Sequence, residues 1–291
     1  MSIGILVPHG KYFAAEHLAR ALNAVMYGLS CRKLNVEHLI IIGKKALEKY
    51  SKLKDKNFKS VAVIFSDTNY CKYYKWCNEY THKNNIPVYA MPDLSDYCLY
   101  PYIPAYQTIT LPEIKIVKPD DNIVICHSPG EKGGFNYKGT KQISSIIMEL
   151  SKNYNIKYLL LENLSWKECI EVKSTAHIFV DQLTKNNPFI DQKRFGGEIR
   201  YHGALGKSGI EGMLLNCCTI TTMDIHETEP YFPFPPVVLT DYQNFKFDLE
   251  ILIKDVDYRN NLIEKQYEWA KKYCSPEFVK MNVTRHINEV I

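Results

Sequence analysis

The sequence has 291 residues, of which 46% are hydrophobic and 23% are charged. This composition supports a folded core, excludes global disorder, and suits two domains. No apolar run approaches the ~18–20 residues of a membrane span. Met1 and Ser2 lead directly into the apolar stretch 3–7, so we expect no signal peptide. Nine cysteines without a CxxC pair predict reduced thiols in a cytoplasmic protein, and the scattered Cys and His residues predict no metal site.

Positive charge is concentrated in the first part of the chain. Residues 1–110 carry 14 Lys and Arg against 8 Asp and Glu, whereas residues 111–291 carry 22 against 24. The segment 44–59 is rich in lysine, with Glu48 and Asp55 as its acidic residues. The simpler interpretation is a solvent-exposed helix face and loop. The alternative is a surface that binds DNA or another polyanion, or an anionic membrane.

Apolar runs alternate with helical periodicity in the first hundred residues. Strands are predicted at 3–8, 38–42, 60–65 and 87–91, and helices at 11–29, 44–53 and 70–84. This alternation predicts a parallel α/β sheet that binds its ligands at the carboxyl ends of the strands. Polar residues that follow those ends are His9, Ser66, Asp67 and Asp93.

Two of these residues, His9 and Asp67, are candidate catalytic groups. His9 either hydrogen-bonds a bound substrate or is a loop histidine without a role. Asp67 is either a carboxylate of the ligand site or the cap of the helix that follows it.

Prolines interrupt the alternation at residues 100–118, which predicts a connection between two domains. The second half is predicted to hold strands at 122–127, 157–162, 177–181, 218–223 and 236–239, and helices at 139–153, from 165, at 207–215, at 255–273 and at 276–289. The predicted fold class is therefore α/β, with two Rossmann-like domains and a deep cleft between them. We expect one domain over 1–110, a second over 111–255, and C-terminal helices over 256–291.

The stretch 123–140 has the clearest functional pattern. A buried strand is followed by a loop with Gly130, Gly133 and Gly134, and then by Lys138 at the start of a helix. Loop amides and the positive end of a helix bind phosphate, and a lysine can close over the anion. The same order of elements occurs in any α/β protein, so the alternative is an exposed lysine at a helix start.

From about residue 121 onward, the chain resembles the nucleotide-sugar domain of retaining glycosyltransferases of the GT-B type, specifically the family 4-like group. Four blocks carry the resemblance, and they stand in the family's order. They are 127–140 with its Lys-Gly, 158–183 with His177 to Gln182, 208–221 with Gly209-Ile210-Glu211, and 258–277 in the closing helices. The resemblance implies a GT-B-like fold whose last helix packs back on the N-terminal domain.

The resemblance also implies roles for particular residues. Lys138 corresponds to the cation on the donor diphosphate, and Glu211 to the carboxylate that accepts hydrogen bonds from ribose hydroxyls. Ser128, Lys132 and Lys207 are further phosphate candidates. Gly209 and Ile210 belong to the same nucleotide-sugar site. Asp181 and Gln182 match a family pattern, with shaping of the loop alone as the alternative.

The chain departs from the family at several positions. Gly203 stands where a first glutamate is common, eight residues before Glu211, and Asn216 stands where glycine is usual. The arginine that often precedes Lys-Gly is absent, with Lys132 as a candidate substitute. The N-terminal domain is short and has no diagnostic acceptor motif.

The function implied is the transfer of a sugar, with retention and without a metal or other cofactor, from a UDP- or GDP-sugar to an acceptor hydroxyl. The acceptor stays open between hydroxymethylated phage DNA and a glycan, lipid or protein at the membrane surface. The richness in Lys, Asn, Ile and Tyr suggests an AT-rich genome, either bacterial or phage. We expect the protein to act in the cytoplasm, that of a bacterial host if a phage encodes it. A non-catalytic GT-B-like nucleotide-binding protein and a sugar-nucleotide epimerase are the competing classes.

Overall fold

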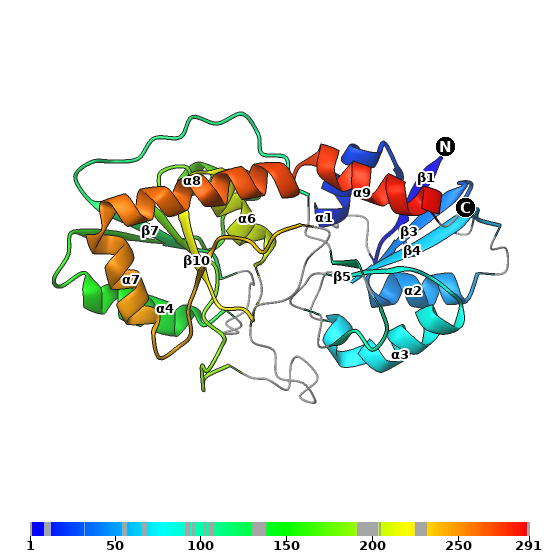
Figure 1. Ribbon diagram of the computed structural model, residues 1–291, viewed down its shortest axis with the longest axis horizontal. Helices are drawn as coiled ribbons and strands as arrows, with labels where there is room; N and C mark the ends of the chain where they lie inside the picture. The colour runs from blue at the N-terminus through cyan, green and yellow to red at the C-terminus, as the bar shows by residue number, and fades with distance from the viewer. Residues whose placement is uncertain are drawn as a thin grey trace.

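The computed structural model describes residues 2–8, 13–31, 33–53, 57–65, 69–90, 94, 97–101, 103–104, 108–129, 138–190, 203, 205–224 and 232–289. Within these ranges the chain forms two α/β units that lie side by side (Figure 1). Each unit has its own parallel sheet, which confirms the predicted pair of Rossmann-like units.

The first sheet has the strand order β2-β1-β3-β4-β5-β6. Its elements are β1 (Ile3–Leu6), α1 (Phe13–Leu22), β2 (Val25–Tyr27), β3 (His38–Ile42), α2 (Lys44–Ser51), β4 (Ser60–Phe65), α3 (Asn69–Lys83), β5 (Val88–Ala90) and β6 (Ile103–Pro104). The helix predicted through residue 29 was wrong in its last turns. It ends at Leu22 because Asn23 takes a left-handed backbone, with a φ of 51°, and the next residues pair with β1 as an edge strand. The predicted connection also contributes β6 to this sheet.

The second sheet has the strand order β11-β10-β9-β7-β8. Its elements, with the helices that follow, are β7 (Ile123–His127), α4 (Thr140–Leu150), β8 (Ile156–Leu160), α5 (Trp166–Lys173), β9 (Ile178–Val180), α6 (Lys207–Leu214), β10 (Cys218–Thr221), β11 (Val238–Leu239), α7 (Phe245–Lys254), α8 (Val256–Tyr273) and α9 (Pro276–Glu289). Helix α7 was not predicted, although Phe245, Leu249, Leu252 and Ile253 bury one apolar face of it.

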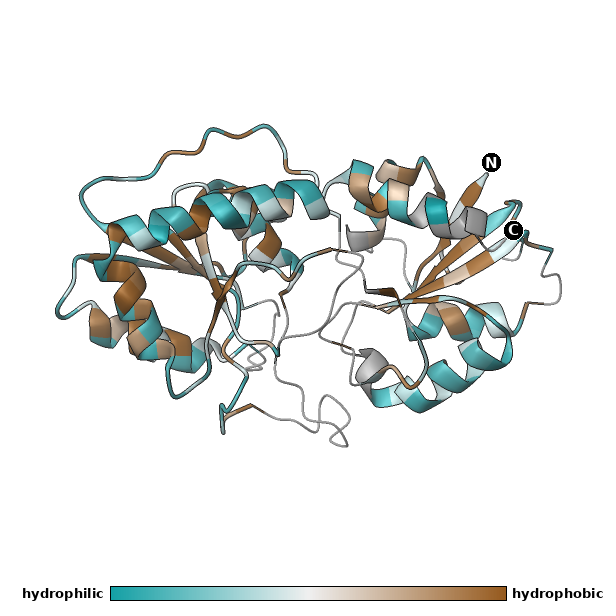
Figure 2. Ribbon diagram, in the orientation of Figure 1, coloured by the Kyte–Doolittle hydropathy of each residue, from teal (hydrophilic) through white to brown (hydrophobic). Residues whose placement is uncertain are grey.

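Successive residues of a strand point to opposite faces of the sheet. Both faces of each parallel sheet carry apolar side chains, and helices cover both of them. In the first sheet, Ile40 and Ile42 pack with α1, whereas Leu39 and Ile41 belong to the cluster that contains α2 and α3. The second sheet repeats this arrangement with α4 and α7 on one face and α5 on the other. Figure 2 shows the resulting hydrophobic strands between helices with hydrophilic outer faces.

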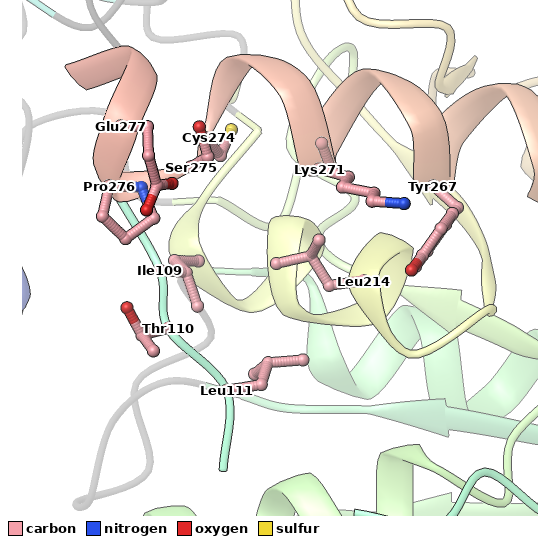
Figure 3. Close-up of a pocket in the computed structure, with 11 residues that line it drawn as sticks. Ile109, Thr110, Leu111, Leu214, Tyr267, Lys271, Cys274, Ser275, Pro276 and Glu277 are labelled. Carbon is pink, nitrogen blue, oxygen red and sulfur yellow. The ribbon is translucent and has the colours of Figure 1, made fainter. Parts of the chain in front are cut away.

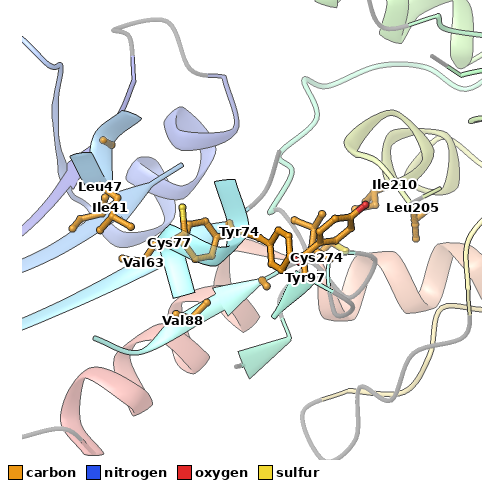
Figure 4. Packing of buried hydrophobic residues seen from close by; sticks show 14 of the residues in the cluster. Ile41, Leu47, Val63, Tyr74, Cys77, Val88, Tyr97, Leu205, Ile210 and Cys274 are labelled. Atoms are coloured by element: carbon orange, nitrogen blue, oxygen red, sulfur yellow. The ribbon is translucent and has the colours of Figure 1, made fainter. Parts of the chain in front are cut away.

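One apolar cluster continues from the first unit into the second. Tyr97 packs edge-on against Tyr74 of α3, with ring centroids 5.6 Å apart, and Ile210 of α6 belongs to the same cluster (Figure 4). Trp269 of α8 is also a member of this cluster. Helix α9 packs on α1, and the amide of Ile109 donates to the carbonyl of Cys274 at 3.2 Å. The connection and the C-terminal helices therefore hold the two units together.

Helix α4 begins at a backbone position that only glycine adopts easily. Gly139 caps the helix in the left-handed region, with a φ of 73°. A Cβ at this position would lie 2.4 Å from the carbonyl oxygen of Leu183. The start of α4 is therefore pressed against the segment that follows β9.

We predict that Gly139→Ala lowers the free energy of unfolding by at least about 2 kcal/mol, because alanine is strained at this φ and its methyl group meets a backbone oxygen. Gly28→Ala is the matched control, since a Cβ there meets nothing within 4 Å. Urea unfolding of both variants provides the measurement. Equal losses in the two variants would contradict this account of Gly139.

Candidate functional site

The predicted phosphate lysine lies at the carboxyl edge of the second sheet. Lys138 precedes the capping residue of α4, and its carbonyl accepts the amide of Leu183 at 2.8 Å. Its ammonium donates to Oδ1 of Asp181 at 2.7 Å. The side chain of Lys138 is 19% exposed. The position of Lys138 is therefore fixed by the backbone hydrogen bond from Leu183 and by the ion pair with Asp181.

Asp181 connects this lysine to the start of α6. The residue follows β9 and is wholly buried, at 0% exposure. Its second oxygen, Oδ2, accepts the amide of Gly206 at 2.8 Å, and Gly206 is the cap that precedes α6. The structure therefore brings the ammonium of Lys138 and the start of α6 together on one carboxylate.

Gly209 and Ile210 have structural surroundings that explain their residue types. A Cβ at Gly209 would lie 2.9 Å from Oδ2 of Asp181, so glycine allows the carboxylate to approach the helix. The side chain of Ile210 is fully buried in the cluster shared by the two units, and its amide donates to the Gly206 carbonyl at 3.1 Å. Their assignment to a nucleotide-sugar site stays a prediction.

Glu211 is held in a buried ion pair. The residue is 3% exposed, and its Oε2 accepts from Lys173 at 2.6 Å. Oε1 accepts from the indole nitrogen of Trp166 at 2.7 Å and lies 3.5 Å from the ammonium of Lys207. Burial raises the pKa of Glu211, but the two ammonium groups outweigh this effect and leave it below its usual value. The carboxylate is therefore ionised and is shared by three donors.

Sequence reasoning missed Lys173 and Trp166 as partners of Glu211. Lys173 lies in the last turn of α5, where a basic residue is common, and nothing local marks it as buried. It is 1% exposed and also donates to the hydroxyl of Ser208 at 2.8 Å. Helix α5, predicted to begin near residue 165, starts with a capping box of Ser165 and Glu168, which places Trp166 at the first helical position.

This cluster also touches the first unit. His17 of α1 lies edge-on to Trp166, with ring centroids 5.9 Å apart, and its Nδ1 accepts the amide of Thr110 at 3.2 Å. Burial, together with the nearby charges of Lys207 and Arg20, lowers the pKa of His17 to about 4. Burial likewise lowers the pKa of Lys207 to about 8, against the opposing effect of Glu211.

His127 and Ser128 occupy the end of β7, beside the phosphate loop. His127 is fully buried, with Nδ1 2.7 Å from the carbonyl of Val180 and Nε2 2.8 Å from the hydroxyl of Thr140. Burial lowers its pKa to about 4, so the neutral ring donates to Val180 and accepts from Thr140. Ser128 follows it and is half-buried.

Several predicted residues lie outside the described ranges, and their roles stay predictions. These are His9, Asp67, Lys132 and the three loop glycines 130, 133 and 134. In the part of the chain that the structure describes, no group of three or more His, Cys, Asp or Glu residues is arranged to hold a metal ion. The helices in that part also include none that is long and apolar enough to cross a membrane.

Two departures from the family pattern have a physical explanation. Gly203 has a φ of 122°, and a Cβ there would lie 1.9 Å from the backbone oxygen of Thr222. This backbone therefore has no room for a glutamate. Asn216 also has a positive φ, 56°, just after α6 ends, and asparagine is the residue besides glycine that tolerates this conformation.

A separate pocket of about 500 Å³ lies where the connection passes the junction of α8 and α9 (Figure 3). Its walls include residues 109–111, Leu214 of α6, and Tyr267 and Lys271 of α8. None of the predicted donor residues that the structure describes lines it, so it is distinct from the Lys138 and Glu211 clusters.

The fold is shared with solved glycosyltransferase structures, whereas no protein-family model and no curated protein matches the sequence. HepE of Anabaena, in complex with UDP and glucose, matches with a TM-score of 0.62 at 9% identity, over 99% of this chain and 100% of its own. Sucrose-phosphate synthase of Thermosynechococcus elongatus matches with a TM-score of 0.65 at 10% identity, over 100% and 99%. An α-glucosyltransferase in complex with UDP-glucose and DNA containing an abasic site matches with a TM-score of 0.57 at 13% identity, over 99% of both chains. At these identities the similarity shows the fold, which is of the GT-B type.

We predict that Lys173→Met lowers the free energy of unfolding by about 3–5 kcal/mol, because it leaves the buried Glu211 carboxylate without its closest cation. Lys246→Met is the matched control. Its partner Glu149 lies 2.7 Å away, but both side chains are about half exposed, so the expected loss is below about 1 kcal/mol. Chemical unfolding compares the two variants, and similar losses would contradict the buried-pair account.

We predict that neutral His127 contributes up to about 3 kcal/mol of stability above pH ~6.5, which is lost as the pH falls toward 4. The direction follows because the folded pKa, about 4, lies below the usual value of 6.5, so the unfolded chain binds the proton first. In His127→Gln, proton uptake on unfolding at pH 5 should fall by about one proton relative to the unchanged chain. The same uptake in both proteins would contradict this assignment.

Proposed function

We propose that the protein is a glycosyltransferase that moves a sugar from a UDP- or GDP-sugar to an acceptor hydroxyl. The strongest support comes from the Asp181 carboxylate in this GT-B fold. It accepts hydrogen bonds from Lys138 and from the amide of Gly206, and so brings the lysine and the start of α6 together. Solved proteins of similar fold hold UDP or UDP-glucose. A cation beside a helix N-terminus is an arrangement that suits a diphosphate.

The proposed chemistry depends on the charge that develops on the leaving group. The bond between the anomeric carbon and the phosphate oxygen breaks, and a bond from the acceptor oxygen to that carbon forms. The acceptor proton passes to the departing phosphate oxygen. Lys138 and the first amides of α6 would stabilise the growing negative charge in place of a metal. Retention and metal independence follow from the family 4-like resemblance and are part of the proposal.

At the nucleoside end, we assign the ribose to Glu211. A carboxylate offers about four acceptor positions, and Trp166, Lys173 and Lys207 account for three donors near Glu211. The contact with Lys207 is the longest, at 3.5 Å. A ribose would therefore approach on the Lys207 side, with the ammonium turning toward the phosphates.

The remaining assignments complete the proposed site. Ser128, Lys132, Gly209 and Ile210 would belong to the donor side, and His9 and Asp67 to the catalytic side. We further propose that 1–110 form the acceptor-side domain, 111–255 the donor domain, and 256–291 the C-terminal helices that return to the first. The activity would take place in the cytoplasm, that of a bacterial host if a phage encodes the chain.

For the acceptor, we propose DNA that carries a hydroxymethylated base. Two of the solved structures of similar fold contain DNA, one of them with an HMU base. In the first unit, the ammonium of Lys44 lies 4.0 Å from the ring centre of Tyr73, and both Tyr73 and Trp76 are exposed. Lysines beside exposed rings suit a nucleic acid through phosphate contacts and stacking. The same face also suits an anionic membrane, so a membrane glycan or lipid is the second acceptor class.

A non-catalytic nucleotide-binding protein is the second candidate function. Two observations favour it. The backbone at Gly203 has no room for a glutamate, and the carboxylate of Glu211 is already paired with Lys173. Such a protein would bind the nucleotide without transferring the sugar.

We predict that a UDP- or GDP-compound at about 100 times its dissociation constant stabilises the protein by about 2.7 kcal/mol. The stabilisation should be strongly reduced in Lys138→Ala and kept in Lys152→Ala, which removes an exposed lysine just after the same helix. Thermal unfolding with a panel of nucleotides provides the measurement. No shift with any compound, or equal shifts in both variants, would contradict the donor site.

Transfer itself is tested by nucleoside diphosphate release from the sugar nucleotide that gives the shift. We predict release that depends on hydroxymethylated DNA and falls steeply with salt. Unmodified DNA is the control for the acceptor group. Nucleotide binding without release on DNA, vesicle or glycan acceptors would favour the non-catalytic function.

A further inference from the structure

Asp181 is a buried charge at the centre of the second sheet. It follows β9, which lies between β10 and β7, and its amide donates to the carbonyl of Ile220 at 3.0 Å. A fully buried carboxylate is costly unless it is paired and hydrogen-bonded. The partners of Asp181 come from two segments that are far apart in sequence. Oδ1 accepts from Lys138 and Oδ2 from the amide of Gly206.

The hydrogen bond to Asp181 leaves Lys138 able to bind a ligand. An ammonium carries three N–H donors, and the bond to Asp181 uses one of them. The side chain of Lys138 is 19% exposed whereas that of Asp181 is 0% exposed. The bond to Asp181 therefore leaves two N–H donors on a side chain that is partly exposed.

The start of α6 is fitted to the same carboxylate. A Cβ at Gly206 would lie 3.4 Å from Oδ2, and a Cβ at Gly209 would lie 2.9 Å from it. The glycine at 209 is thus required for this approach. The carboxylate fixes where the first turn of α6 lies relative to Lys138.

We propose that Asp181 is a positioning residue of the donor site, which holds the ammonium of Lys138 and the N-terminus of α6 so that one diphosphate binds both. This inference rests on the proposed function. Asp181 has two simpler alternative roles. It would be a counter-charge that only neutralises Lys138, or a member of an ion pair that only stabilises the fold.

The three roles predict different effects of Asp181→Asn. If Asp181 only neutralised Lys138, removal of its charge would strengthen the binding of anions. If it were only structural, the variant would lose affinity for every ligand of the unit together with its stability. Positioning predicts a loss that is confined to ligands with a diphosphate.

The test is a double-mutant cycle of Asp181→Asn and Lys138→Met, with pyrophosphate, UDP, GDP and the nucleosides uridine and guanosine titrated by calorimetry. We expect each single variant to bind pyrophosphate and the preferred nucleoside diphosphate about tenfold more weakly, as for one lost charge-assisted hydrogen bond. Binding of the matching nucleoside should change less than twofold. The double variant should lose little more than either single variant, because the two residues act as a unit.

Asp224→Asn is the matched control, since it removes the carboxylate of a partly exposed pair, Lys185–Asp224, with the same 2.7 Å separation. Its affinity for diphosphates should stay unchanged. If Asp181→Asn does not fold, Asp181→Ser replaces it, and melting shifts with pyrophosphate replace calorimetry.

Tighter or unchanged pyrophosphate binding in Asp181→Asn would overturn the proposal, and so would a parallel loss of nucleoside affinity. If the unchanged protein binds pyrophosphate but no nucleotide, the proposed function fails while the cycle still decides the role of Asp181. If it binds none of these anions, both are overturned.

Discussion

The pairing of the buried Asp181 carboxylate is the constraint on which the candidate site depends. The second sheet places this group where water does not reach, so its charge must be satisfied by the protein. The donors are the side chain of Lys138 and the backbone of Gly206, one before α4 and the other before α6. The glycine at 209 follows from the same requirement, because a Cβ there would lie 2.9 Å from Oδ2 of Asp181.

A second buried charge joins the two units of the fold. Glu211 and Lys173 pair behind Trp166, and His17 of the first unit contacts the same indole. The apolar cluster that includes Tyr97 and Ile210 continues this contact. The proposed donor groups are thus built into the region where the units meet, so the positions of the phosphate and ribose groups depend on both units.

Much of the fold was predictable because alternating apolar runs and helical periodicity are local signals. Strand β2 and helix α7 were not predicted. Strand β2 depends on the left-handed turn at Asn23, whereas α7 has an apolar face with helical periodicity. Lys138 and Glu211 were recognisable from motifs. Asp181 also matched a motif, but its pairing with Lys138 and that of Lys173 with Glu211 were not predictable, because each pair joins residues about forty positions apart in sequence. The glycine at 203 was visible as a departure, and its cause, the closeness of Thr222, required the structure.

The most direct measurement is a crystal structure of the protein with UDP or GDP bound. The account predicts diphosphate oxygens within about 3 Å of both the Lys138 ammonium and the first-turn amides of α6, with Asp181 still paired to Lys138. A diphosphate bound elsewhere, for example in the pocket beside Ile109 and Lys271, would contradict the central claim that these two elements form the donor site.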